Sequence, residues 1–479
     1  MNCPRYKILL LFLGLILHQS VQSQNYHALN GSKYAGVFGM YNNPASTVNA
    51  PMKWDLNVFS LQGTTTNSLI AFNHFSLSNF DSTTVNITEG KRSRFFNAAI
   101  DMNILNLRFA IGRNKAIAFG LRGRTYNHVK TSTFTTYDSI TSFSGFLHAN
   151  TNTDYLSGFA THAGWIEGDI NYSQVWIDDA RHRVSGGITL GIMRGLSGAF
   201  SQLNKLTYRE YPDAQNNYYQ IITGGTATAE YSKNYDLADT NTITAAAIKS
   251  FLKNTRTAFS LSLGMEYLIK KDEIDETKPG YETDYNWKIG VSIMDIGANT
   301  FDPAGGSFYA GIPKTNITAD RLRQQFLNAT SLKKLRDSLL QTMNLVDTLS
   351  SEFSITIPTR LLISVDKNLN NNFYINGQLN VNFYSAEPYN KIKTRELNLV
   401  TITPRWETRT WGVYLPVQYN AQGQLWAGAA LKAGPLLIGI HNVGWLFGKM
   451  QQLNGGGYIA LHFTPAPKKI KTRLDCPVE

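Results

Sequence analysis

Long apolar runs are scarce in this sequence, which excludes one large class of membrane protein. A transmembrane helix needs roughly 18 to 20 consecutive apolar residues. The longest apolar run, Ile8 to Leu17, is shorter than that. Arg5 and Lys7 precede it, and small residues follow before Gln24, as in a secretory signal peptide. We therefore expect residues 1–23 to be a signal peptide and exclude a helical membrane protein.

Cysteine and charged residues are also scarce. Of the two cysteines, Cys3 lies in the expected leader, which leaves Cys476 without a partner for an internal disulfide. Charged residues make up 16% of the chain, against a typical share near 25%, while aromatics reach 12%. A large surface is therefore expected to face something other than water. The basic residues are scattered and form no stripe, so nucleic acid is not an expected partner.

Linear motifs of catalysis and metal binding are missing as well. The sequence has no His-Glu-x-x-His helix, Walker loop or Cys-x-x-Cys pair, and Gly195-Leu196-Ser197-Gly198 lacks the Gly-x-Ser-x-Gly spacing. We therefore expect that the protein is not an enzyme and that it has no catalytic residue, metal or cofactor. One alternative stays open, because outer-membrane proteases and phospholipases carry such groups on separate strands. Its candidates are His441 and His462, with Glu266 and Asp295.

Two-residue alternation is what the sequence has in abundance. Between Phe373 and Tyr384, apolar residues alternate with Tyr374, Asn376, Gln378, Asn380 and Asn382. This period is typical of a strand with one apolar and one polar face. About a dozen further segments repeat it. The sequence therefore predicts an all-β fold, a transmembrane antiparallel barrel of about 14 strands in the bacterial outer membrane, with lipid around it.

The length of the connections alternates between long and short along the chain. Long polar segments, such as His128 to Gly168, alternate with short ones, such as Arg181 to Arg183. Single-chain outer-membrane barrels have long outer loops and short periplasmic turns. We expect the barrel to span residues 53–464 and a periplasmic tail to follow at residues 465–479.

The segment before the first strand has a different character. Residues 24–52 are small, polar and rich in turn residues, and they include Asn42, Asn43, Pro44 and Ala45. No strand periodicity long enough to cross a membrane occurs in it. We expect this segment to be a hatch or plug inside the barrel.

One insert, residues 299–352, carries a helical pattern. Leu332, Leu335, Leu339 and Met343 recur at three and four residues, continuing through Val346 and Leu349. Thr318 is a plausible N-cap of a preceding turn. We expect a helical insert in an outer loop, serving either as a lid or partner-binding helix or as a hairpin packed on the barrel rim.

The polar register of the strands suggests what lines the lumen. The candidates for lumen-lining residues are Arg108, Arg122, Arg124, Glu266, Lys288, Asn376, Gln378 and Asn380. The cations among them would favour anionic solutes, or would pair with carboxylates such as Asp101, Asp295 and Asp366. The pairing is the favoured interpretation.

Prolines interrupt the expected strands at Pro358, Pro404 and Pro416, and each removes a ladder donor. Pro416 lies inside a well-alternating strand, so it is the candidate wall kink that could open the barrel sideways. A β-bulge that adjusts curvature is the simpler alternative.

The segment Tyr41-Asn42-Asn43-Pro44-Ala45 resembles the Asn-Pro-Ala hatch motif of FadL-type fatty-acid transporters and related PorV-like barrels. Lys53-Trp54-Asp55-Leu56-Asn57 and Ile357-Pro358-Thr359-Arg360-Leu361 resemble an uncharacterised family of secreted barrels over nearly the whole chain. This resemblance implies a FadL-like barrel of 14 strands with an N-terminal hatch. It implies no particular ligand.

Two hypotheses for function follow. The first is passive transport of a small hydrophobic or amphipathic ligand in FadL-like manner, with release by movement of the hatch or of the wall kink. The second is a barrel that does not transport and instead binds a secretion or cell-surface partner through its long outer loops.

Overall fold

The computed structural model describes residues 27–73, 84–213, 218–234, 251–271, 281–329, 331–384, 392–396, 398–447 and 451–465. The expected signal peptide and residues 466–479 of the expected tail lie outside these ranges. Strands dominate the described part, and no helix in it is long and apolar enough to cross a membrane. The helices are α2 (Phe143–His148), α5 (Ala319–Asn328), α6 (Leu332–Leu339), α7 (Gly444–Phe447) and the 3-10 turns η1 (His27–Leu29), η2 (Gly36–Tyr41), η3 (Pro44–Asn49) and η4 (Tyr281–Thr283).

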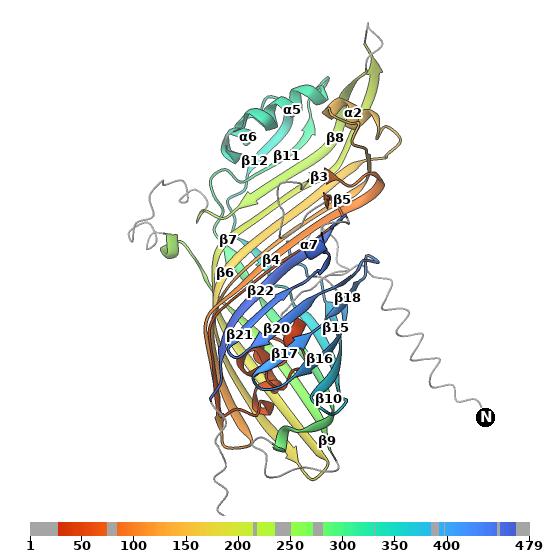
Figure 1. Cartoon of the computed structure of the whole chain (residues 1–479). Coiled ribbons are helices and arrows are strands. Elements are labelled where there is room, and N and C mark those ends of the chain that lie inside the picture. The colour runs from red at the N-terminus through yellow and green to blue at the C-terminus, as the bar shows by residue number, and fades with distance from the viewer. Residues whose placement is uncertain are drawn as a thin grey trace, which may run out of the picture.

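The strands form one large sheet and one small hairpin (Figure 1). The hairpin is β2 (Ile70–Asn73) with β3 (Thr84–Ile87). The large sheet contains β1 (Trp54–Asn67), β4 (Gly90–Ile111), β5 (Lys115–Thr136), β6 (Leu156–Asp178), β7 (His182–Pro212), β8 (Tyr218–Tyr231), β9 (Thr257–Lys270), β10 (Tyr285–Phe301), β11 (Phe308–Pro313), β12 (Met343–Thr348), β13 (Phe353–Thr356), β14 (Arg360–Asn368), β15 (Phe373–Asn382), β16 (Leu399–Glu407), β17 (Trp411–Tyr414), β18 (Val417–Asn420), β19 (Leu425–Ala427), β20 (Ala429–Ala433), β21 (Leu436–Ile440) and β22 (Asn454–Phe463).

The large sheet closes into a barrel. β1 pairs antiparallel with β4 on one side and with β22 on the other, so first and last strands meet. The broken strands β17/β18 and β19/β20 each fill one position in the wall. With β1, β4 to β7, β9, β10, β14 to β16, β21 and β22 the wall has 14 strands. The predicted strand number and fold class are confirmed.

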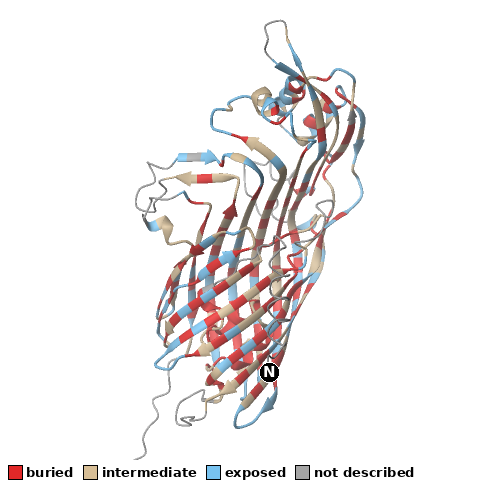
Figure 2. Cartoon of the chain, turned by 90° about the vertical axis from the view of Figure 1, so that its right-hand side faces the viewer, coloured by how far each residue is buried: buried red, intermediate tan, exposed pale blue. Residues whose placement is uncertain are grey.

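Side chains sort by polarity across the barrel wall. Along β15, Tyr374, Asn376, Gln378, Asn380 and Asn382 are buried and face inward, whereas the alternate apolar residues are exposed or half-buried (Figure 2). Other strands also expose large apolar side chains: Leu190 is 56% and Phe259 70% exposed. An apolar outside around a polar inside is the architecture of outer-membrane barrels, because hydrocarbon covers the outer face. The protein is a bacterial outer-membrane β-barrel.

Leu190→Arg is expected to lower the free energy of unfolding by about 2–4 kcal/mol, because it places a cation on the lipid-facing wall. Urea titration of the barrel refolded in lipid vesicles measures this. The matched control is Leu327→Arg on α5, which is similarly exposed, 63% against 56%, but lies far from the barrel wall. The control should change stability by no more than about 0.5 kcal/mol. Equal effects at both positions would argue against a hydrocarbon environment at Leu190.

Several strands are much longer than a membrane is thick. β7 has 31 residues and β6 has 23, whereas roughly 9–11 tilted residues span a bilayer. The expectation that His128 to Gly168 is a connection was therefore wrong over much of its length, since β5 continues to Thr136 and β6 begins at Leu156. These strand ends leave the membrane, so they need no apolar outer face and their sequence shows none.

The long strand ends carry a separate structure at one end of the barrel, formed by residues 130–160, 200–234 and 302–349 where described (the head). In it β8 pairs with β7 and β11, and β11 pairs with β12. Helices α2, α5 and α6 lie on this sheet, at the end of the molecule away from the N-terminal turns (Figure 1).

The helix predicted from Leu332 to Leu349 is only partly present. Helix α6 contains Leu332, Leu335 and Leu339 and ends there, whereas Met343 and Val346 belong to strand β12. The spacing of three and four residues is compatible with one continuous helix, and equally with a shorter helix that is followed by a strand. Pairing of β12 with β11, between Met343 and Pro313 at one end, decides the outcome. Thr318 caps α5, with its hydroxyl accepting from the Arg321 amide.

The prolines lie at irregularities of the wall. Pro416 separates β17 from β18, and Pro358 lies between β13 and β14. Pro404 stays inside β16, contrary to the expected interruption. Its carbonyl accepts from Leu415 N–H, and the Pro416 carbonyl accepts from Gly428 N–H. The breaks in the two neighbouring strands, β17/β18 and β19/β20, thus lie at the level of Pro404 and locate the kink at Pro416.

Candidate functional site

The N-terminal segment, residues 27–52, lies inside the barrel as a series of tight turns (Figure 1). The Asn43 side chain caps η3 by accepting from the Ala45 amide at 3.0 Å, and Pro44 occupies the first position of that turn. Gly36 has a φ of +56° and lies against the Asp55 carboxylate, where a Cβ has no room. Turns that expose many backbone groups suit a segment surrounded by polar walls.

The Asn-Pro-Ala residues touch the barrel wall at a patch of glycines. Asn43 Nδ2 donates to the Met265 carbonyl at 2.8 Å. A Cβ on Gly187 would lie 2.3 Å from the Pro44 carbonyl carbon, and one on Gly264 would lie 2.1 Å from Asn43 Oδ1. Gly187 and Gly264 are paired across β7 and β9. The motif therefore fits against the wall only because these positions lack side chains.

The residues predicted to line the lumen are all buried on the inner side of the wall, and most contact the N-terminal segment. Lys288 Nζ donates to the Gly31 carbonyl at 2.6 Å, and Glu266 accepts from Asn49 Nδ2 at 2.7 Å. Three more of these wall residues have polar contacts: Arg108 with the Thr47 carbonyl and Asp55, Gln378 with Asn30 Nδ2, and Asn376 with Ser364. Asn380 is buried on β15. Within the N-terminal segment, Asn42 contacts Asn30, and the Ala45 carbonyl contacts Ser185 of the wall.

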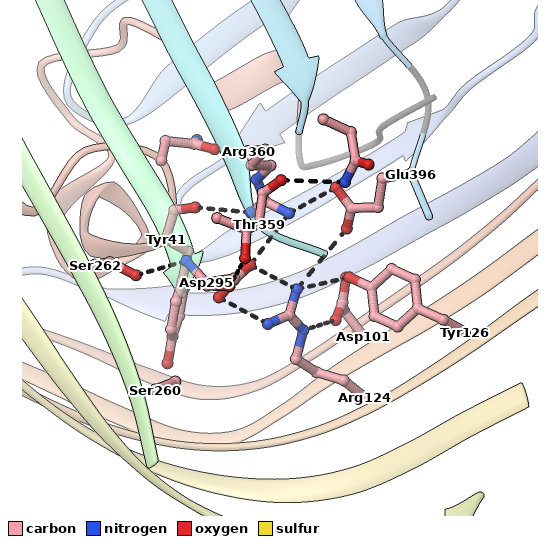
Figure 3. A network of polar contacts seen from close by, with 12 residues as sticks. Tyr41, Asp101, Arg124, Tyr126, Ser260, Ser262, Asp295, Thr359, Arg360 and Glu396 are labelled. Atoms are coloured by element: carbon pink, nitrogen blue, oxygen red, sulfur yellow. Dashed lines mark hydrogen bonds and ion pairs between the residues drawn. The ribbon is translucent and has the colours of Figure 1, made fainter. Parts of the chain in front are cut away.

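Above the N-terminal segment, a network of buried ion pairs crosses the barrel (Figure 3). Asp295 lies at its centre. Its carboxylate accepts from Arg124 Nη1 at 2.9 Å and Nη2 at 3.0 Å, and lies 3.3 Å from Arg360 Nη1 and 3.5 Å from Arg122 Nη2. Glu396 accepts from Arg360 at 2.7 Å. Arg122 also pairs with Asp169 at 3.0 Å, and Arg124 with Asp101 at 3.0 Å.

The network joins the wall to the N-terminal segment. The Arg122 guanidinium lies 4.2 Å from the centre of the Tyr41 ring, and Arg360 Nη2 donates to the Tyr41 carbonyl at 3.4 Å. Arginines and carboxylates alternate in it, as burial of charge requires. The interpretation of Arg122 and Arg124 as an unpaired cationic lining therefore does not describe this structure.

The residues kept as catalytic alternatives are not brought together. His441 and His462 lie at opposite ends of the β21–β22 ladder, because His441 N–H donates to Gly456 and His462 N–H donates to Pro435. His462 Nε2 instead lies 3.0 Å from Asp55. Within the described ranges, no group of three or more His, Cys, Asp or Glu residues could hold a metal ion.

The head contains an apolar cavity of about 390 Å³. Its lining comes from segments far apart in the sequence, including Phe134, Phe146, Leu206, Ile222, Leu322 and Met343. Aliphatic and aromatic side chains with few polar groups are what a pocket for a small hydrophobic molecule presents. No periodicity predicted this cavity, because its walls combine residues of three helices, α2, α5 and α6, with residues of strands β5 to β8, β11 and β12.

Several of these side chains, among them Leu206, Ile222 and Met343, also belong to the apolar core of the head. Leu147 of α2, Leu335 and Leu339 of α6 and Met343 of β12 are buried together. The Tyr208 hydroxyl donates to the Leu147 carbonyl at 2.7 Å, which fixes the end of α2. Burial raises the pKa of Tyr208 to about 12. The cavity therefore lies beside the packed core of the head, and the half-exposed Phe326 is part of its wall.

Comparison with solved structures finds several barrels of low similarity. A Pseudomonas aeruginosa FadL homologue is 12% identical, with a TM-score of 0.40 over 93% of this chain and 98% of that one. A deletion mutant of the monoaromatic hydrocarbon channel TodX is 10% identical, with 0.40 over 93% and 94%. The Ralstonia pickettii toluene transporter TbuX is 10% identical, with 0.39 over 90% and 94%. No curated protein sequence matches the chain.

A family model covers most of the polypeptide. It matches residues 44–440, from the Asn-Pro-Ala turn to the end of β21. The matched region thus includes the wall from β1 to β21, the ion-pair network and the head. The chain belongs to this family, the family of unknown function DUF5723.

Proposed function

We propose that this protein captures a small hydrophobic or amphipathic molecule in the cavity of its head and admits it passively across the outer membrane. The apolar cavity of about 390 Å³ carries the proposal. Its volume falls within the usual range for small-molecule pockets, roughly 300–1,000 Å³. Its apolar lining selects for hydrophobic surface over charge, because burial of apolar area supplies the binding free energy.

Passage beyond the head requires a rearrangement. Below the cavity the lumen holds the ion-pair network and the N-terminal segment, and both are polar and buried. A hydrophobic molecule gains nothing from such surroundings. The proposal therefore assigns the N-terminal segment the role of a hatch, which moves away from the wall when ligand enters.

Ala227→Trp is the test of the cavity. Ala227 lines it, so the indole would occupy part of its volume. The affinity of the purified barrel for the fluorescent probe N-phenyl-1-naphthylamine should fall at least about tenfold, a loss of about 1.4 kcal/mol. Thr223→Trp is the matched control, since Thr223 is exposed on the same strand and does not line the cavity. Unchanged probe affinity in a folded Ala227→Trp barrel would contradict capture in the head.

A second candidate function is binding of a protein partner at the head. Phe326 and Leu327 of α5 and Leu340 after α6 are 50%, 63% and 53% exposed. Clustered exposed apolar residues mark interaction surfaces. Pull-down with the Leu327→Ser/Leu340→Ser double variant tests it: neither residue lines the cavity, so a specific partner should be lost while binding of the probe in the cavity is retained.

A further inference from the structure

Three polar side chains on the outer face of the barrel form a hydrogen-bonded relay. Ser197 Oγ lies 2.8 Å from His162 Nε2, and His162 Nδ1 lies 2.8 Å from Asn127 Oδ1. The three residues come from adjacent strands, Asn127 from β5, His162 from β6 and Ser197 from β7. A hydroxyl on one imidazole nitrogen and an acceptor on the other is the geometry of an activated serine nucleophile.

The relay points out of the barrel. Its members are half-buried, whereas their chain neighbours Tyr126 and His128, and Thr161 and Ala163, are buried on the inner side. Successive residues of a strand face opposite sides, so the relay lies on the side that bears the lipid-facing residues. It is therefore separate from the polar lumen, and none of its members lines the cavity of the head.

The relay lies at the head-side edge of the apolar band. On β6 the outward positions run from Ile170 through Gly168, Ile166 and Gly164 to His162. On β7 the exposed Leu190 and Ile192 precede it. Polar outward residues begin at this level, which corresponds to the membrane–water boundary of the wall. Acyl chains and water can both reach such a position.

Local irregularities of the wall make room for the serine. The partner of β7 changes from β9, which pairs up to Arg194, to β8, which pairs from Ala199, so Ser197 lies in the fork. The register with β6 also shifts between Gly164 and Trp165, which leaves Leu196 without an opposite residue there. A Cβ on Gly164 would lie 2.8 Å from Ser197 Oγ, so the glycine admits the hydroxyl.

We propose that this relay is a second functional site, which hydrolyses carboxylic esters of lipids at the surface of the membrane. Ser197 and His162 are its catalytic residues, and Asn127 is a positioning residue that holds His162 Nδ1 protonated. In this proposal the bulged backbone at Leu196 and Ser197 supplies the N–H groups that stabilise the oxyanion. The ester substrate follows from the location, because the apolar wall below the relay would seat an acyl chain.

The chemical steps balance without a cofactor. Ser197 Oγ attacks the ester carbonyl carbon while its proton passes to His162 Nε2, and a C–O bond forms. The tetrahedral intermediate collapses, the bond to the alcohol breaks, and the alcohol leaves with the proton from Nε2. Water then attacks the acyl-serine, gives its proton to His162, and releases the fatty acid as Ser197 Oγ regains the proton. One ester and one water yield one acid and one alcohol.

Covalent labelling of the full-length barrel in detergent tests the serine. A fluorophosphonate probe should modify the peptide that contains Ser197, and hydrolysis of p-nitrophenyl butyrate should be lost together with it. Ser197→Ala and His162→Gln should each lower the labelling rate at least about 100-fold, the usual contribution of a base and nucleophile pair. Ser201→Ala is the matched control, because Ser201 is exposed two outward positions further along β7, and it should label like wild type.

Folding is checked by the heat-dependent gel shift of each variant. A folded wild-type barrel that leaves Ser197 unlabelled overturns the proposal, as does a folded His162→Gln barrel that labels at the wild-type rate. Probe capture in the head does not depend on this result, so the two proposals fail separately.

The role of Asn127 is tested by a pH profile. Asn127→Ala should lower ester hydrolysis about tenfold or more, because the imidazole loses its orienting acceptor. Asn127→Asp keeps an acceptor oxygen and should restore activity, while its negative charge favours protonated His162 and moves the acidic limb of the pH profile to higher pH. A residue with only a structural role would leave that limb unchanged.

Discussion

Asp295→Asn is expected to lower the free energy of unfolding of the barrel by about 3–5 kcal/mol, the usual cost of removing one partner from a buried ion pair. The carboxylate of Asp295 faces three arginines, Arg122, Arg124 and Arg360, all buried. Without it, these cations keep only the carboxylates at the edges of the network, and the charge at its centre is no longer balanced.

Asparagine is the right replacement at this position for a conformational reason. Asp295 has a φ of +58°, in the left-handed region that asparagine and aspartate tolerate better than other residues with a side chain. The backbone and the shape of the side chain are therefore retained, so the change isolates the charge. Urea titration of the refolded barrel in vesicles, followed by tryptophan fluorescence, measures the loss.

Asp302→Asn is the matched control for the same change of charge. Asp302 pairs with Arg256 at 2.8 Å, but the two side chains are 37% and 40% exposed. Exposed ion pairs contribute little, so the control should cost less than about 1 kcal/mol. Similar losses for the two variants would mean that the buried network does not stabilise the barrel.

Gly187→Val is expected to displace the N-terminal segment from the wall and to make the barrel leaky. The new Cβ would lie 2.3–2.5 Å from backbone atoms of Pro44 and Ala45, which cannot rotate away as a side chain could. Overpacking of this kind costs about 1–3 kcal/mol. That cost corresponds to a shift of roughly 5–150-fold in the equilibrium between the docked and undocked segment.

Ion conductance in planar bilayers and protease sensitivity near Pro44 both report on this displacement, and both should rise. Gly168→Val on β6 is the control, because a Cβ there meets nothing within 4 Å. It should conduct like wild type. A Gly187→Val barrel that stays closed would contradict the assignment of the N-terminal segment as a movable hatch. That result would not affect the assignment of the barrel fold.

Comparison of particular elements shows where sequence patterns were sufficient. The alternation from Phe373 to Tyr384 corresponds almost residue for residue to β15. Successive residues of a strand face opposite sides of the wall, so lipid on one side and polar groups on the other impose a period of two. The pattern failed for the head ends of β5, β6 and β7. Water on both sides of a strand imposes no alternation, so nothing in the sequence distinguished them from loops.

The candidate sites show the same division. Arg122 and Arg124 were recognisable as inward residues, but their pairing with Asp295 joins strands 171 to 173 positions apart. Asn127, His162 and Ser197 are spaced 35 residues apart, and their polarity looks ordinary within polar stretches. Met343 was predicted to lie in a helix because the local spacing of apolar residues gives no information about β11, the strand with which this segment pairs.

The sequence by itself determined the faces of the strands, and with them a closed barrel with an apolar outside, because hydrocarbon and water act on every second residue independently of the rest of the chain. Only the tertiary structure decided the cavity of the head, the ion-pair network and the outward relay. Each of these depends on which strands become neighbours and in what register, and register is a property of pairs of segments that neither segment carries alone.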